Sequence, residues 1–318
     1  MVAPHAKLSP ILTGGLGGSA GGAIRKRGVG LTAQVRFTPR PLQPYPHWQR
    51  EAYDETGSDR DLLAHTKAFE TLLDPMAIDW WDDTRIFLWP HEQLSAAIAR
   101  TGGFEMATAC ALRRLLFPSA CVIDAGANSG VFTVLAARWC ERVIAVEPSP
   151  RELRKLAANI DLNGFENVAV IAAALGAEPG KATLRVGDDR YAGHNTLAGR
   201  FGYATPLDSE IEVEVTTIDA LAAPADVIKI DVEGAEVDLL TGAWRTLRTY
   251  RPTLILEANP LVLEAYGASL AALGTVLEEA GYALFDIASD TADLVPLASL
   301  ADAIGENIVA RHKSIMNA

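Results

Sequence analysis

One short loop carries the residue types expected of a ligand-binding site. Residues 121–130 read Cys-Val-Ile-Asp-Ala-Gly-Ala-Asn-Ser-Gly, and an apolar, helix-forming stretch follows them. A strand, a glycine-containing loop and a helix in this order form the usual entrance to a nucleotide site. Gly126 allows a ligand to approach the backbone closely, Asn128 tolerates the left-handed backbone region, and Gly130 permits close packing of the helix on the strand.

The glycine spacing in this loop indicates which cofactor it binds. Dinucleotide sites need G-x-G-x-x-G, whereas this loop has only Gly126 and Gly130, with Asp124 two residues before the first glycine. The pattern D-x-G-x-N-x-G lacks the tight turn that holds a pyrophosphate. It looks like the loop that binds S-adenosylmethionine, which has no phosphate. We therefore expect Asp124 to face the cationic methionine end of that cofactor.

A second acidic residue is placed to bind a ribose. Glu147 ends the second expected strand, 23 residues after Asp124, and Pro148 follows it. A carboxylate at that edge can accept hydrogen bonds from both ribose hydroxyls. Dehydrogenases use the same device, and an acid before a proline can also simply begin a helix, so Glu147 alone does not discriminate. Together with the loop, it predicts ribose binding.

A third cluster of residues has the composition of a catalytic edge. Residues 229–236 read Lys-Ile-Asp-Val-Glu-Gly-Ala-Glu and end the fourth main strand, at the edge of the sheet where substrates dock. We expect Asp231 to face the transferable group, with Lys229 on the same face of the strand offsetting part of the charge. Glu233 and Glu236 could simply open the next helix, where acids are favoured. Three carboxylates this close also gather at sites that bind cations or remove protons.

The order of elements after Cys110 predicts an α/β domain with a mostly parallel sheet and helices on both faces. Short β-branched runs alternate with helical stretches, which indicates successive βαβ units. The expected strands are residues 122–125, 143–147, 168–172, 227–231, 254–258 and 283–287, and the expected helices lie near residues 131–139, 150–163, 235–250 and 270–280. An inserted segment, residues 181–218, contains a half-exposed strand at 211–215.

Residues 1–50 differ in composition from the rest. They contain seven basic residues and no acid, together with eight of the 26 glycines and six of the 17 prolines. We interpret them as a disordered basic tail rather than as an organelle transit peptide, because serine is scarce.

A small helical and aromatic cap is expected over residues 51–105, before a main domain over residues 106–318. Apolar residues fall on one helical face, and a group of aromatic residues follows, which we expect to pack against the main domain rather than to form a substrate platform. These are Leu62, Phe69, Leu72 and Leu73 for the helix, and Trp80, Trp81, Phe87 and Trp89 for the aromatic group.

The composition excludes several classes of protein. The net charge of the 318 residues is −12, so a general nucleic-acid binder is not expected. Three cysteines are too few for a disulfide framework, and their odd number favours a reducing compartment. The apolar runs are far shorter than the roughly 18–20 residues that span a bilayer, and no long apolar leader is present, so we expect a cytoplasmic protein without a membrane span.

Four stretches in chain order carry a family resemblance: Gly103-Phe104-Glu105, Val122–Gly130, Val146-Glu147-Pro148 and Ile228–Glu236. Together they resemble the FkbM family of S-adenosylmethionine-dependent methyltransferases, over roughly residues 100–260. The resemblance implies a class I methyltransferase fold with a Rossmann-like, seven-stranded sheet. It also implies O-methylation of a hydroxyl on a small molecule, commonly a sugar, a glycan or a secondary metabolite. Amino-methylating enzymes of nucleic acids carry [N/D]-P-P-[Y/F/W] where this chain has Asp-Val-Glu-Gly.

The resemblance and the loops together give a set of candidate residues. We expect the cofactor-binding residues to be Glu105, Asp124, Gly126, Asn128, Gly130, Glu147, Pro148 and Asp231. Gly193–Leu197 stands where serines are common in relatives, and Glu257 ends the fifth strand, as an acid often does in the family. The cap and residues 181–218 are expected to build the acceptor pocket.

Methyl transfer to a hydroxyl benefits from a general base. Asp231 is the first candidate, Glu233 the second and His194 the third. Oxygen atoms of Asp231, Glu233 and Glu236 could coordinate Mg²⁺, but the resemblance implies no metal. Two alternative functions are a nicotinamide-dependent oxidoreductase, which the missing G-x-G-x-x-G disfavours, and a cofactor-binding protein without catalysis.

Overall fold

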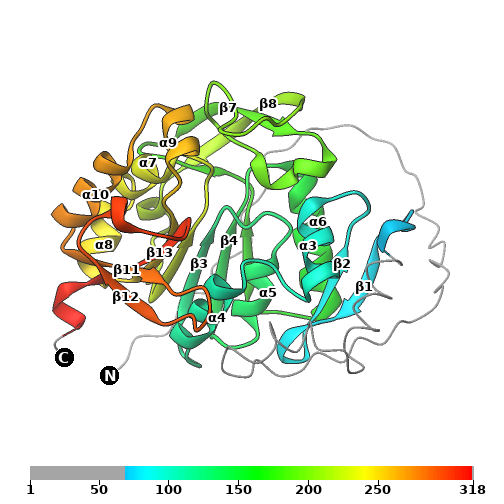
Figure 1. Cartoon of the computed structure of the whole chain (residues 1–318), viewed down its shortest axis with the longest axis horizontal. Helices are drawn as coiled ribbons and strands as arrows, with labels where there is room; N and C mark the ends of the chain where they lie inside the picture. Colours follow the sequence, from blue (N-terminus) through cyan, green and yellow to red (C-terminus); the bar gives the residue numbers. More distant parts are fainter. Residues whose placement is uncertain (1–68, 317–318) are drawn as a thin grey trace. The chain divides into compact units, whose positions relative to one another are not determined.

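The computed structural model describes residues 69–316 (Figure 1). The expected tail over residues 1–50 and the position of Leu62 lie outside the described residues. Within residues 69–316, no single helix is long and apolar enough to cross a bilayer, although one bent pair of helices, Pro260–Tyr266 and Leu270–Glu279, reaches that length and composition when taken together.

The elements follow one another along the chain in an alternating order. The strands are β1 (Met76–Asp79), β2 (Arg85–Leu88), β3 (Cys121–Ala125), β4 (Arg142–Val146), β5 (Val168–Ile171), β6 (Ala174–Leu175), β7 (Gly180–Gly187), β8 (Leu207–Thr216), β9 (Val227–Ile230), β10 (Thr253–Glu257), β11 (Tyr282–Ile287), β12 (Leu294–Leu297) and β13 (Asn307–His312). The α-helices are α3 (Gln93–Thr101), α4 (Met106–Leu115), α5 (Val131–Ala137), α6 (Pro150–Asn163), α7 (Glu236–Thr241), α8 (Trp244–Tyr250), α9 (Pro260–Tyr266) and α10 (Leu270–Glu279). Short 3₁₀ helices are η1 (Trp81–Asp83), η2 (Asp189–His194), η3 (Ile218–Leu221), η4 (Leu300–Asp302) and η5 (Lys313–Ile315).

The main sheet of the described chain has eight strands in the order β12-β11-β13-β10-β9-β3-β4-β5. Strands β5, β4, β3, β9 and β10 are parallel, and β13 enters between β10 and β11 as an antiparallel strand. The chain runs outward from β3 through β4 to β5, then returns to β9 on the other side of β3. This reversal between β3 and β9 is the switch point at which open α/β sheets bind ligands.

Side chains alternate along the strands, so each face of the sheet has its own core. Val122 faces one core and Ile123 the other. The first core packs against α4, α5 and α6 through residues that include Leu112, Val134, Leu135 and Leu156. The second core packs against α7, α8 and α10 through Leu239, Leu240, Leu247, Leu273 and Leu277. Figure 1 shows these two helix layers on opposite sides of the sheet, which confirms the expected class I methyltransferase fold.

Two expectations about this domain need correction. The sheet has an eighth strand, β12, beyond the seven expected, because residues 294–297 pair with β11 at the edge. The single helix expected over residues 235–250 is two helices, α7 and α8. The carbonyl of Gly242 accepts a hydrogen bond from the amide of Asp219 at 3.0 Å, and its backbone lies against Gly176, so the chain turns there.

The cap expected over residues 51–105 is only partly helical in its described portion. β1 and β2 form an antiparallel hairpin, and α3 follows it. Leu72 and Leu73 lie beyond the last helical residue of that stretch, and Leu73 is 86% exposed, so the expected helical face does not reach them. The side chains of Trp80 and Trp81 are buried and stacked, with ring centroids 4.7 Å apart, in the core that contains α4 and α5. These two aromatic residues pack against the main domain, as expected.

The hairpin and α3 (residues 76–101, called the cover below) are attached to α6 by polar contacts. Asn159 is fully buried; its Oδ1 accepts the amide hydrogen of Phe87 at 2.8 Å, and its Nδ2 donates to the carbonyl of Ser129 at 2.7 Å. The ammonium of Lys155 pairs with the buried carboxylate of Glu92, next to α3, at 2.8 Å. One face of α6 thus positions both the cover and the glycine loop.

We expect Asn159→Ala to lower the free energy of unfolding by about 2–4 kcal/mol, because it leaves a donor and an acceptor without partners. The matched control is Asn163→Ala, whose side chain bonds the backbone of Arg85 in an exposed setting and should cost less than about 1.5 kcal/mol. Urea unfolding of both variants measures the difference. An equal loss in the two variants would contradict this role of Asn159.

Candidate active site

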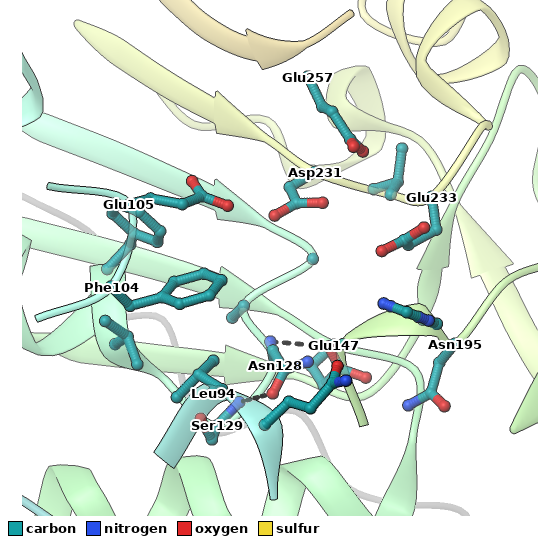
Figure 2. Close-up of a pocket in the computed structure, with 18 of the residues that line it drawn as sticks. Leu94, Phe104, Glu105, Asn128, Ser129, Glu147, Asn195, Asp231, Glu233 and Glu257 are labelled. Atoms are coloured by element: carbon teal, nitrogen blue, oxygen red, sulfur yellow. Dashed lines mark hydrogen bonds between the residues drawn. The ribbon is translucent and has the colours of Figure 1, made fainter. Parts of the chain in front are cut away.

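A cavity of about 780 Å³ opens at the carboxyl edge of the main sheet (Figure 2). Its lining comes mainly from three groups of elements: the ends of β3, β4, β9 and β10 with the loops after them, α3 with the residues just before it in the cover, and the segment between β7 and β8. Glu105 and Glu306 add to it from just before α4 and β13. The two segments expected to build an acceptor pocket therefore both contribute to its wall.

The glycine loop passes directly against the backbone of the next strand. Gly126 has a φ of +80°, and a Cβ placed on it would lie 1.7 Å from the carbonyl oxygen of Asp231. The amides of Gly126 and Ala127 both donate to the carbonyl of Val146 at 3.0 Å. Asn128 adopts the left-handed region with φ of +51°, and at Gly130 a Cβ would lie 2.6 Å from Leu156 of α6. The loop therefore needs the residue types found at these positions.

Glu147, the residue after β4, is hydrogen-bonded to the glycine loop that follows β3. Its two carboxylate oxygens accept the amide hydrogens of Asn128 and Ser149, each at 2.8 Å, and it lies on the cavity wall beside Pro148 (Figure 2). Burial raises the pKa of Glu147 from its ordinary 4.5 to about 7, although the two backbone donors lower it. Each oxygen keeps a second lone pair that can accept a hydrogen bond.

A buried ammonium organises the acids below the cavity. Nζ of Lys229 is 2.7 Å from Oδ2 of Asp231, as the strand spacing predicted. Burial alone would lower the pKa of Lys229, but Asp231, Asp124 and Glu105 raise it above its usual value, so the side chain is cationic. Asp124 is 1% exposed and bonds the hydroxyl of Thr133 at 2.5 Å. Burial raises the pKa of Asp124. Asp124 is not among the residues that line the cavity, so it supports the loop from below.

Of the two acids expected to open the next helix, Glu233 lies in a turn before it, whereas Glu236 is the first residue of α7, as expected. Glu233 has φ of +51° and precedes Gly234, and α7 begins only at Glu236. The carboxylate of Glu233 lines the cavity, whereas the fully buried Glu236 turns back and accepts the amide hydrogen of Gly234 at 3.2 Å. Burial, followed by Asp231, raises the pKa of Glu233 well above its usual range. Glu236 therefore stabilises, from the first position of α7, the turn that precedes it.

Two more acids reach the same cavity from other elements. Glu105, at the start of α4, accepts a hydrogen bond from Nδ2 of Asn307 at 3.2 Å, and burial followed by Asp231 raises its pKa from 4.5 to about 7. Glu257 ends β10, is 8% exposed and points towards Asp231 (Figure 2). Burial, followed by Asp231 and Glu233, raises the pKa of Glu257 well above its usual range.

His194 and Asn195 lie on the opposite wall. Nδ1 of His194 is 2.6 Å from the hydroxyl of Thr205, and the ring is packed between Tyr191 and Tyr203. Burial lowers the pKa of His194, so its imidazole is neutral near pH 7. Oδ1 of Asn195 accepts the amide hydrogen of Gly187, while its Nδ2 has no partner among residues 69–316.

A comparison with known protein families identifies the family of the chain that carries this site. The sequence model of the Methyltransferase FkbM domain matches residues 124–284, half of the chain. The chain belongs to the FkbM methyltransferase family.

Individual relatives of this FkbM chain are distant. Methyltransferase sdnD from Sordaria araneosa is 26% identical over 216 residues, which cover 55% of this chain and 77% of that protein. Methyltransferase 1 from Beauveria bassiana is 26% identical over 143 residues, covering 38% of this chain and 57% of that protein. The crystal structure of Methyltransferase FkbM from Methylobacillus flagellatus KT is 20% identical, with a TM-score of 0.39, and the match covers 61% of this chain and 44% of that one. These matches do not favour the nicotinamide-dependent alternative.

Sequence reasoning missed several side chains on the cavity wall of this FkbM domain. Tyr203 lies in the segment between β7 and β8, and Glu306 directly precedes β13. The apolar run Ile308-Val309-Ala310 was the one signal for that strand. Leu94 and Arg100 reach the cavity from α3, which lies within the helical cap expected over residues 51–105 but outside the one helical face identified there.

We expect Gly126→Ala to destabilise the FkbM domain through overlap with the carbonyl of Asp231. Gly267→Ala is the matched control, because Gly267 also has a positive φ, +99°, but a Cβ there meets no atom within 4 Å. The control should cost about 1–2 kcal/mol for its backbone conformation. Gly126→Ala should cost about 1–3 kcal/mol more, the usual range for overpacking, as measured by urea unfolding. Equal losses would show that the close contact does not matter.

Glu147 should make stability depend on pH. Its pKa is raised in the folded chain, so its contribution to folding is fully present below about pH 4.5 and is lost as the pH rises through about 7. The free energy of unfolding of the wild type, minus that of Glu147→Gln, should therefore fall across this window, by up to about 3 kcal/mol, and stay constant above it. Denaturant titrations between pH 4 and pH 8.5 measure this, with the exposed Glu178→Gln controlling for the change in net charge. A difference that rises with pH would contradict the assignment.

Proposed function

We propose that this chain transfers a methyl group from S-adenosylmethionine to a hydroxyl of a sugar, a glycan or a secondary metabolite. One observation carries the proposal. The glycine loop with Glu147 and the acidic turn with Asp231 and Glu233 face a single cavity at the switch point of the sheet. One half of that cavity suits a cofactor, and the other half suits an acceptor.

The cofactor half is formed by the loops after β3 and β4. The positive φ values of Gly126 and Asn128 let the loop backbone pack close to the carboxyl ends of the strands, which leaves space in the cavity for a ligand. The free lone pairs of Glu147 are available to two ribose hydroxyls. Asp231 and Glu105 place negative charge where the sulfonium cation of the cofactor would lie, and Pro148 completes this part of the wall.

The acceptor half is polar and comes from segments outside the sheet. Tyr203, His194 and Asn195 supply hydrogen-bonding groups from the segment between β7 and β8, and Arg100 does so from α3. Such a wall suits an acceptor with several hydroxyl groups, because each can be paired with a fixed donor or acceptor.

Methyl transfer needs alignment and a proton acceptor more than it needs covalent chemistry from the protein. The acceptor oxygen forms a bond to the methyl carbon while the carbon–sulfur bond breaks. The electron pair of the carbon–sulfur bond stays on sulfur, so neutral S-adenosylhomocysteine is released. The hydroxyl proton passes to a base. Asp231, held by Lys229, is the first candidate, and Glu233 and His194 are the others on the cavity wall.

The decisive experiment incubates the full chain with methyl-labelled S-adenosylmethionine and extracts of sugars, glycans and metabolites, followed by mass spectrometry. We expect a labelled methyl ether and stoichiometric S-adenosylhomocysteine. Calorimetry should show binding of S-adenosylmethionine and none of NAD. Cofactor binding without transfer to any hydroxyl compound would contradict the proposal.

Substitution of the candidate base provides the second test. Asp231→Asn should lower turnover at saturating cofactor by about 10²–10⁴-fold, the usual contribution of a general base, and it should also weaken cofactor binding because Asp231 faces the sulfonium. Glu233→Gln and His194→Gln are measured beside it. Glu210→Gln, on the exposed side of β8, controls for loss of one charge. Full turnover of Asp231→Asn with bound cofactor would rule Asp231 out as the base.

A further inference from the structure

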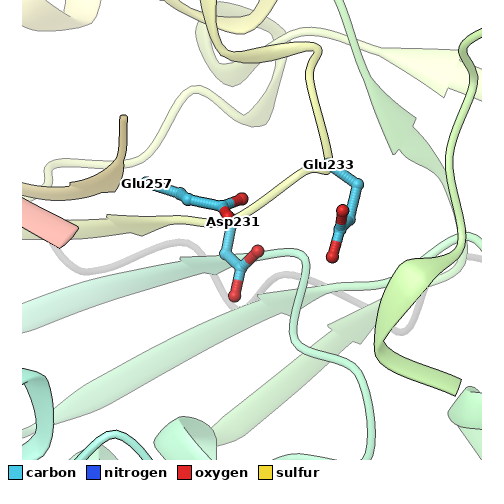
Figure 3. Close-up of side chains that lie close together, drawn as sticks. All are labelled: Asp231, Glu233 and Glu257. Carbon is cyan, nitrogen blue, oxygen red and sulfur yellow. The ribbon is translucent and has the colours of Figure 1, made fainter. Parts of the chain in front are cut away.

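Three carboxylates converge on one point at the floor of the cavity. Oxygen atoms of Asp231, Glu233 and Glu257 lie within 4.8 Å of one another (Figure 3). The parallel register pairs Ile230 of β9 with Leu256 of β10, so Asp231 and Glu257 are the next residues on two adjacent strands. The turn after Asp231 then brings Glu233 to the same place, and the hydroxyl of Thr196 holds this turn by donating to the carbonyl of Glu233 at 2.7 Å.

Glu257 supplies an independent sign that a ligand belongs there. Its side chain is 8% exposed, and Oε1 receives one long hydrogen bond of 3.3 Å from Asn259. Oε2 is completely buried and has no donor among the described residues. A buried carboxylate oxygen without a partner is costly, and the carboxylate of Glu257 that carries it points towards Asp231 (Figure 3). A bound group carrying positive charge would remove that cost.

The charge balance at this point favours a divalent cation. Within residues 69–316, Lys229 is the only basic side chain that forms an ion pair with any of the three acids, and it contacts just one oxygen of Asp231. If all three acids are ionised around a bound cation, the one ammonium leaves two of their negative charges for that cation to balance. Carboxylate oxygens are the ligands preferred by Mg²⁺ and similar hard cations, which also retain water or substrate oxygens in open positions.

We propose that Asp231, Glu233 and Glu257 bind one divalent cation of the Mg²⁺ type, and that an acceptor oxygen occupies an open coordination position. This proposal departs from the expectation of no metal. It also differs from the oxygen set considered from the sequence. Oε1 of Glu236 accepts the amide hydrogens of Val232 and Gly234, and Glu236 does not belong to the group of carboxylates whose oxygen atoms lie within 4.8 Å of one another. Glu257, from the neighbouring strand, takes its place.

The role of the cation in the reaction rests on the proposed function. A cation lowers the pKa of the hydroxyl that it binds, so a weaker base suffices. Asp231 would then act as a ligand, and the neutral imidazole of His194 would receive the proton. With Nδ1–H donating to the hydroxyl of Thr205, Nε2 carries the lone pair. The acceptor oxygen forms the bond to the methyl carbon, and the carbon–sulfur electron pair remains on sulfur.

Mn²⁺ alone is the probe for this site. The full chain is stripped with a chelator and titrated with Mn²⁺, and the free ion is followed by electron paramagnetic resonance. We expect one site per chain. Asp231→Asn and Glu257→Gln should each weaken binding at least about 100-fold, since even loss of an outer partner of a metal ligand typically costs 10–100-fold. Glu306→Gln removes the same charge from the same cavity wall outside the trio and should weaken binding less than about 10-fold.

Thermal unfolding of every variant shows whether it is folded, and Mn²⁺ should raise the melting temperature of the wild type but not of Glu257→Gln. Absence of stoichiometric Mn²⁺ binding, or equal binding by Glu257→Gln and the wild type, would overturn the proposed site. Full methyl transfer by chelator-stripped protein would overturn the role of the cation and leave the transferase function intact. Mn²⁺ binding without transfer to any hydroxyl compound would overturn the proposed function and leave the site intact.

Discussion

The close contact between two backbone segments at the carboxyl ends of β3 and β9 determines where everything else in the site lies. The amide of Asp231 donates to the carbonyl of Ala125 at 3.0 Å, and Gly126 then passes so close to the Asp231 carbonyl that no side chain fits between them. Because the two strands separate only after this contact, the glycine loop and the acidic turn leave the sheet at the same point. The two halves of the cavity, which we propose to hold the cofactor and the acceptor, are adjacent for this reason.

This geometry concentrates charge in a small volume. Asp231, Asp124 and Glu105 all act on the ammonium of Lys229, and Glu233 and Glu257 lie beyond them. Ionised carboxylates are costly to bury, so a free cavity of this kind holds protons on some of its acids. The same acids would lose those protons when a cationic ligand binds. Part of the net negative charge of the chain is therefore concentrated at this cavity, where it favours cationic ligands, in addition to disfavouring nucleic acids.

The features predicted from the sequence are those encoded by neighbouring residues. The strands around the loop, helix α6 and the pairing of Lys229 with Asp231 follow from short-range patterns, because period and spacing determine which face a side chain occupies. Features that depend on distant segments were missed or misassigned. The break after α7 depends on the contact of Gly242 with Asp219 and with the chain before β7, and the hairpin of the cover depends on α6. The exchange of Glu236 for Glu257 in the acidic cluster depends on the register of β9 and β10, which composition does not reveal.

Strand β13 has a consequence for how the family region is delimited. It lies between β10 and β11 in the sheet but follows both in the chain, whereas the family match ends at residue 284, inside β11. A fragment cut at the limits of the match would therefore keep two strands that have no contact with each other and would expose a backbone edge on each. Such edges pair readily with other chains. The segment matched by the family model is thus smaller than the part of the chain that is needed to pair every strand of the main sheet.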